Sequence, residues 1–144
     1  MSVNPMPAGF HTVAPNIIVK SVDAAVSFYK RAFGAEEILR LTMPDGKVVH
    51  CELKFGDSRV NLGEAMEGWP EHSLLAQIFV ADSDTVFAQA VAAGAKALSP
   101  VSDMFFGSRE GRVLDPFGST WTISTHKEDV SAEEMQRRLN ALAD

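Results

Sequence analysis

The chain has 144 residues, the size of a single domain that can bury most of its unfolded surface. Its composition, 46% hydrophobic and 22% charged, is typical of a soluble globular protein, and no apolar run approaches the ~20 residues that cross a bilayer. The net charge of -6, with Lys and Arg scattered singly or in pairs, argues against nucleic acid as a partner. A membrane location is excluded on the same composition.

The compartment is expected to be the cytoplasm. The first twelve residues, MSVNPMPAGFHT, lack the basic start and apolar stretch of a secretory signal. The single cysteine, Cys51, cannot form an internal disulfide, which agrees with a reducing compartment.

The first half of the chain predicts the order βαβββ. A β-branched strand is followed by a helix with apolar residues at helical spacing, which Ser21 or Asp23 can cap and Gly34 can end. Three extended stretches follow, separated by turn residues. The predicted elements are a strand at 14–20, a helix at 21–34 and strands at 36–44, 47–56 and 58–64.

The second half repeats this order at a constant shift of 61 residues. The shift places 77–80 on 16–19 and Asp84 on Asp23. A strand at 75–84, a helix at 83–94, an extended stretch at 95–107 and a hairpin of 110–115 with 119–125 are predicted. We therefore expect one α+β domain of two βαβββ modules, 12–66 and 74–126, whose sheets close around a cleft. A C-terminal helix is predicted at 131–142, capped by Ser131 and Glu134.

Three long segments carry a resemblance to a known family. They read VAPNIIVKSVDAAVSFYKRAFGAEE, MPDGKVVHCELKFGDSRVNLGE and FFGSREGRVLDPFGSTWTISTHKEDVSAEEM. The chain resembles, from about residue 12 to 140, the vicinal oxygen chelate superfamily of glyoxalases, bleomycin resistance proteins and extradiol dioxygenases, and within it the PhnB-like branch. The resemblance implies the fold and a homodimer, with the cleft either within one chain or shared between swapped modules. It does not fix the reaction, because one scaffold hosts many chemistries.

Metal-dependent members of that superfamily use four His or Glu ligands, and the resemblance assigns those positions here. They fall on Ala14, Asn61, Leu75 and Thr122. Ala and Leu have no donor atom, and Asn and Thr offer only neutral oxygens that hold a transition metal poorly. We therefore expect no metal at the family position, and no other cofactor.

Two further readings of the cleft stay open. Asn16, Asn61, Gln77 and Thr122 could line it with neutral groups for a polar or anionic small molecule, or could instead satisfy backbone groups at strand ends. His50 and Glu52 share one face of a strand, where they could serve as an acid–base pair or as two ligands of a divalent metal.

The segment MFFGSREGR, residues 104–112, is predicted as a loop across the cleft mouth. Gly107 and Gly111 would let it bend, Phe106 could close on an apolar group and Arg109 could pair with an anion. The alternative places the aromatic rings in the core and Arg109 in solvent.

Whether the protein is an enzyme is left open by the sequence. The favoured function is metal-free binding of a small polar or anionic molecule. The alternative is a metal-dependent lyase, isomerase or dioxygenase with nonstandard ligands such as His50 and Glu52. A structural or regulatory dimer is the third possibility.

Overall fold

The computed structural model describes residues 2–144. Within these residues, eight strands and three helices follow one another in the order predicted from the sequence. The elements are β1 Asn16–Val19, α1 Val22–Phe33, β2 Glu36–Thr42, β3 Val48–Phe55, β4 Ser58–Glu64, β5 Leu75–Phe79, α2 Ser83–Ala93, β6 Lys96–Asp103, β7 Ser108–Leu114, β8 Thr120–His126 and α3 Ala132–Ala143. No helix of the described residues is long and apolar enough to span a bilayer.

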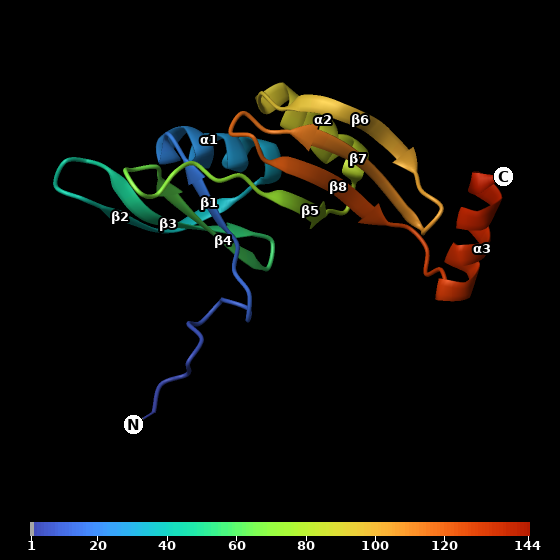
Figure 1. Cartoon of the computed structure of the whole chain (residues 1–144), viewed down its shortest axis with the longest axis horizontal. Coiled ribbons are helices and arrows are strands. Elements are labelled where there is room, and N and C mark those ends of the chain that lie inside the picture. Colours follow the sequence, from blue (N-terminus) through green and yellow to red (C-terminus); the bar gives the residue numbers. More distant parts are fainter. Residues whose placement is uncertain (1) are drawn as a thin grey trace. The chain divides into compact units, whose positions relative to one another are not determined.

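The chain divides into two compact units, which meet in sequence between Leu74 and Leu75. Each unit contains one four-stranded mixed sheet, ordered β1-β4-β3-β2 in the first and β5-β8-β7-β6 in the second (Figure 1). The parallel pairs share one register, because Asn16 lies opposite Asn61 and Gln77 lies opposite Thr122. The predicted α+β class, with two βαβββ modules and a C-terminal helix, is confirmed.

The core of the first unit lies between α1 and its sheet. Ser21 caps the helix by accepting a hydrogen bond from the Ala24 N–H, and Gly34 ends it with a left-handed φ of 68°. Alternate residues of β3, among them Cys51 and Leu53, are fully buried toward the helix. The intervening residues of β3 therefore point to the opposite face of the sheet.

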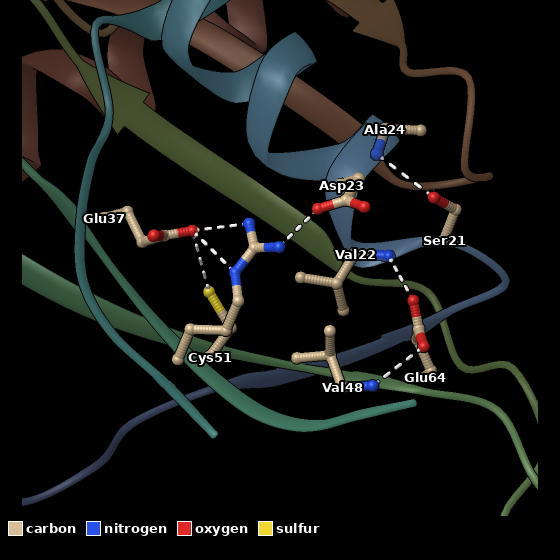
Figure 2. A network of polar contacts seen from close by, with 9 residues as sticks. Ser21, Val22, Asp23, Ala24, Glu37, Val48, Cys51 and Glu64 are labelled. Carbon is tan, nitrogen blue, oxygen red and sulfur yellow. Dashed lines mark hydrogen bonds and ion pairs between the residues drawn. The ribbon is translucent and has the colours of Figure 1, made fainter. Parts of the chain in front are cut away.

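Glu64 joins α1 to the sheet at the end of β4. One carboxylate oxygen accepts from the Val22 N–H at 3.0 Å and the other accepts from the Val48 N–H at 2.9 Å (Figure 2). In the second unit the hydroxyl of Thr125 accepts from the Ser83 N–H at 2.9 Å. Both partners stand 61 positions after their counterparts, so the repeat preserves this helix-to-sheet connection.

A second polar network lies between α1, β2 and β3. Arg40 pairs with Asp23 on the helix and with Glu37, whose Oε1 also lies 3.9 Å from the Cys51 sulfur (Figure 2). These two carboxylates raise the pKa of the Arg40 guanidinium above its ordinary value by hydrogen bonding. The network occupies the helix side of the sheet, so it has no part in the opposite face.

Residues 108–112 belong to β7, so the prediction of a loop over 104–112 is wrong for them, whereas the strand predicted at 110–115 agrees with β7. Gly107 does make a turn, with a φ of 96°. Gly111 serves close packing instead, because a Cβ there would lie 2.9 Å from ring carbons of Phe87 in α2. The sequence does not distinguish a bend glycine from a packing glycine.

The C-terminal helix α3 follows β8 through a short extended segment (Figure 1). Ser131 caps it by accepting from the Glu134 N–H, as predicted. The Glu134 carboxylate is engaged with Arg137 and Arg138 rather than reaching back to complete the capping box. Arg138 also donates to the Phe105 carbonyl at 2.9 Å, which ties α3 to the turn before β7.

Candidate functional site

A large hollow lies on the first unit, over the sheet face that α1 does not cover. Its volume is about 1070 Å³, which is enough for a small organic molecule. One wall is the N-terminal segment, residues 4–12, together with Ala14. The floor comes from β2, β3 and β4, which contribute Ile38, Leu39, His50, Glu52, Arg59 and Asn61.

Three charged or ionisable side chains of the floor are joined through Glu52. One oxygen of its carboxylate lies 3.0 Å from His50 Nε2 and the other lies 3.2 Å from Arg59 Nη1. His50 and Glu52 are two residues apart on β3, and Arg59 comes from the neighbouring strand β4. The predicted placement of His50 and Glu52 on one face is what the structure shows.

Two buried polar atoms of β4 have no hydrogen-bond partner in the described part of the chain. They are Arg59 Nε, a donor, and Asn61 Oδ1, an acceptor. Both residues line the hollow. A buried polar atom without a partner costs about 1–3 kcal/mol. Neither atom has exposed surface, so a ligand can pair with it only after the side chain shifts toward the hollow.

The N-terminal segment contacts the site through Phe10. Its ring centre lies 5.3 Å from the Arg59 guanidinium carbon, within range of a cation–π interaction. Gly9 lies against the same guanidinium, since a Cβ there would be 2.5 Å from Nη2. Phe10 therefore helps to hold Arg59 in place above β4.

The other predicted contact residues on strands are Asn16 in the first unit and Gln77 and Thr122 in the second. Asn16 is exposed beside Asn61 at the start of β1. Gln77 and Thr122 adjoin on the second unit, where the Gln77 amide donates to Ser124 Oγ at 2.9 Å and Ser124 Oγ donates to Glu110 at 2.6 Å.

Arg109 and Phe106, both in the second unit, have partners of their own. Arg109 binds Asp84 of α2 through two hydrogen bonds, of 2.7 and 3.0 Å, and also binds Asp103. It lies opposite Thr125 in the β7–β8 ladder, whereas Thr122 belongs to the alternate set. The Phe106 ring packs edge-on against Phe105 at 5.1 Å. The guanidinium of Arg109 is therefore already paired with two carboxylates, so an anionic ligand would have to compete with them.

The donor set at the metal positions of the resembled superfamily does not fit a metal. Ala14 and Leu75 offer no donor atom, and Asn61 and Thr122 offer neutral oxygens. Within residues 2–144, no three His, Cys, Asp or Glu side chains gather closely enough to hold a metal ion.

The comparison with known families agrees with this architecture. A model of the Glyoxalase/Bleomycin resistance protein/Dioxygenase superfamily matches residues 9–123. The chain belongs to this superfamily. A PhnB protein from Bacillus cereus has a similar structure, with a TM-score of 0.60 at 17% identity over 80% of this chain and 99% of that one. At that identity the likeness concerns the fold alone.

Two further members of the comparison are more similar in sequence. The crystal structure of TioX from Micromonospora sp. ML1 gives a TM-score of 0.69 at 26% identity, with 79% of this chain and 97% of that chain covered. An uncharacterized protein from Mycobacterium bovis is 29% identical over 158 residues, covering 100% of this chain and 99% of that protein. Neither description states a reaction, so the superfamily does not assign one here.

The sequence predictions missed Arg59 and Phe10. Arg59 had a usable signal, because it stands two residues before Asn61 on the same strand and must share its face. Phe10 had none, since it precedes the first strand in a segment without a periodic pattern. Its contact with Arg59 depends on the course of the N-terminal segment.

Proposed function

We propose that this superfamily member binds a small polar molecule in the hollow of its first unit, without a metal at the usual superfamily positions. The observation that carries the proposal is the pair of unpartnered buried atoms, Arg59 Nε and Asn61 Oδ1, in the floor of that hollow. A ligand that pairs with both would recover the free energy that their burial costs. The contacts of Asn16, Gln77 and Thr122 with a ligand remain predictions.

A thermal-shift screen against polar and anionic small molecules tests the proposal. A ligand present at 100 times its dissociation constant should raise the free energy of unfolding by about 2.7 kcal/mol. Arg59→Met should abolish the shift, because it removes the donor while keeping much of the side-chain volume. Arg31→Met, on the exposed surface of α1, is the matched control and should keep it. A library without any stabilising compound, or hits that survive Arg59→Met unchanged, would count against the hollow as the binding site.

A second candidate function rests on the 3.0 Å contact between His50 and Glu52. Such a pair could transfer a proton, or could contribute two ligands to a divalent metal with further donors from a substrate. Elemental analysis of the purified protein tests the metal version. A stoichiometric transition metal that is lost in His50→Ala would replace the metal-free proposal.

We also propose that the protein is a cytoplasmic homodimer. The superfamily resemblance supports the dimer, and a single free cysteine supports a reducing compartment. Sedimentation equilibrium gives the oligomeric state directly: a mass of one chain at micromolar concentration would contradict the dimer.

A further inference from the structure

Building on the proposed function, we infer that the ligand of the first unit presents a neutral amide-type group, a primary amide, secondary amide or lactam, attached to an apolar body. The inference selects one chemistry from the wider class of polar and anionic molecules. It rests on three features of the hollow: its charge balance, the complementary hydrogen-bonding atoms of β4, and its apolar wall.

The charge balance favours a neutral group. Arg59 is the arginine of the floor, and its Nη1 is already paired with Glu52 at 3.2 Å. The side chains of both residues are largely buried, with 14% and 15% exposed, so their pairing is poorly screened by solvent. A carboxylate ligand would bring a second negative charge beside Glu52, and the other basic side chain of the floor, His50, already lies 3.0 Å from the same carboxylate. A neutral group avoids that repulsion.

The hydrogen-bonding atoms call for a ligand that both donates and accepts. Arg59 Nε can only donate, so it needs a carbonyl or similar oxygen. Asn61 Oδ1 can only accept, so it needs an N–H or O–H. The two residues are neighbours on one strand face, roughly 6–7 Å apart along β4. An amide supplies a C=O and an N–H within one rigid planar group, which suits this arrangement.

The wall of the hollow favours an apolar body beyond the amide. The N-terminal segment brings Met6, Pro7 and Phe10, and β2 brings Ile38 and Leu39. Ile38 and Leu39 are each 41% exposed, which leaves apolar surface available to a ligand. An aromatic or branched aliphatic group could cover that surface and gain about 25 cal/mol for each Å² removed from water.

Three probes of nearly equal shape separate the contributions. They are phenylacetamide, which donates and accepts; phenylacetate, which is anionic and accepts only; and N,N-dimethylphenylacetamide, which is neutral and accepts only. Titrations at millimolar concentration are followed by the ¹⁵N–¹H signals of the Arg59 Nε–H and the Asn61 side-chain amide. We expect phenylacetamide to bind about 10-fold more tightly than the dimethyl compound, which lacks the N–H and thus a term of about 1.4 kcal/mol. Phenylacetate should bind more weakly still, because it lacks the N–H and adds a negative charge beside Glu52.

Two variants sharpen the assignment. Asn61→Asp keeps an acceptor and adds a negative charge, so it should retain phenylacetamide and weaken phenylacetate further. Arg59→Lys keeps the cation and removes the Nε donor, so it should weaken phenylacetamide. Arg31→Met, on the exposed helix surface, should bind all three probes as the wild type does, and the dispersion of its spectrum provides a folding reference.

The outcomes separate this inference from the proposed function. Phenylacetate binding as tightly as phenylacetamide, with shifts at the same two residues, overturns the amide class and leaves binding in the hollow intact. Equal binding of the dimethyl compound overturns the role of Asn61 as an acceptor. If no probe moves either signal, the amide inference is overturned and the thermal-shift screen alone decides the proposed function.

Discussion

Asp115 organises the turn between β7 and β8 through three donors. Its Oδ1 accepts from the N–H groups of Phe117 and Ser119, and its Oδ2 accepts from the Trp121 indole, all at 2.9 Å. The side chain is almost fully buried. Asp115→Ala should lower the free energy of unfolding by about 2–4 kcal/mol, because it leaves buried donors unpaired.

Urea denaturation of that variant measures the loss. Asp115→Asn should cost less, because it retains one acceptor oxygen while turning an NH₂ group toward a donor. Asp57→Ala, in the exposed turn of the first unit, serves as the control and should change stability little. A loss below about 1 kcal/mol for Asp115→Ala would show that the turn keeps its form without the carboxylate.

Cys51 should be chemically inert while the protein is folded. Its burial, followed by the nearby negative charge of Glu37, raises the pKa of the thiol to about 11. Thiolate is the reactive form, so little is present at pH 8. Ellman's reagent should label the native protein very slowly and should label the one thiol promptly in urea. Prompt labelling of the native state would mean that β3 opens frequently.

At the level of single residues, the sequence predicts on which strand and face a side chain lies better than it predicts which side chains it contacts. The repeat places Asn61 and Thr122 at equivalent positions, and strand parity places His50 beside Glu52. Parity alone does not reveal that Arg59 completes the group, or that Arg109 is paired with Asp84 and Asp103. Such pairings depend on which strands and helices become neighbours.

Helix α3 depends on Glu134 for its first turns. Hydrogen bonds from Arg137 and Arg138 lower the pKa of the Glu134 carboxyl to about 2. A carboxyl whose pKa is lower in the folded state stabilises that state fully above its ordinary pKa near 4.3 and loses this effect as the pH falls toward 2. The amide protons of α3 should therefore exchange faster as the pH is lowered through this range, after correction for intrinsic rates.

An NMR titration of the carboxyl carbons measures the effect directly. Glu134→Gln should remove this pH dependence of α3, and Glu133→Gln, at an exposed neighbouring position, should leave it unchanged. A Glu134 carboxyl that titrates near 4.3 would show that the arginine contacts are not maintained in solution.

At the level of elements, the sequence predicts existence and order well and boundaries less well. Helix α1 begins after Ser21 and ends at Gly34 as predicted, because capping residues mark both ends. The error at 108–112 arose because Gly111 is a strand residue packed against Phe87. Tertiary packing, which local patterns do not encode, decided that strand.

The charge of the whole molecule predicts how it behaves toward nucleic acids. With a net charge of -6, the chain lacks the clustered cations that release counterions from a phosphate backbone. Fluorescence anisotropy of a labelled DNA duplex should stay unchanged at micromolar protein, even at low ionic strength. Binding that weakens steeply as salt is added would reveal a basic surface that the net charge conceals.

The duplicated architecture could be predicted because both halves of the sequence show the same order of strands and helix. Both sheets have the same strand order and the same register between their parallel strands. The N-terminal segment was not predictable, since it has no repeat partner and contacts the first unit through side chains such as Phe10. The wall that the N-terminal segment contributes to the candidate site could therefore not be predicted from sequence periodicity.

Glu64 and Thr125 each link the last strand of their unit to the start of its helix, and they do so with different chemical groups. A carboxylate serves one helix and a hydroxyl serves the other, although both accept from the first backbone N–H of the helix, which has no partner within the helix. The two units thus make the equivalent hydrogen bond with different chemical groups. Duplicated units of this kind are therefore better recognised by comparing which backbone N–H groups need a hydrogen-bond acceptor at equivalent positions. Counting identical residues would miss the equivalence of Glu64 and Thr125.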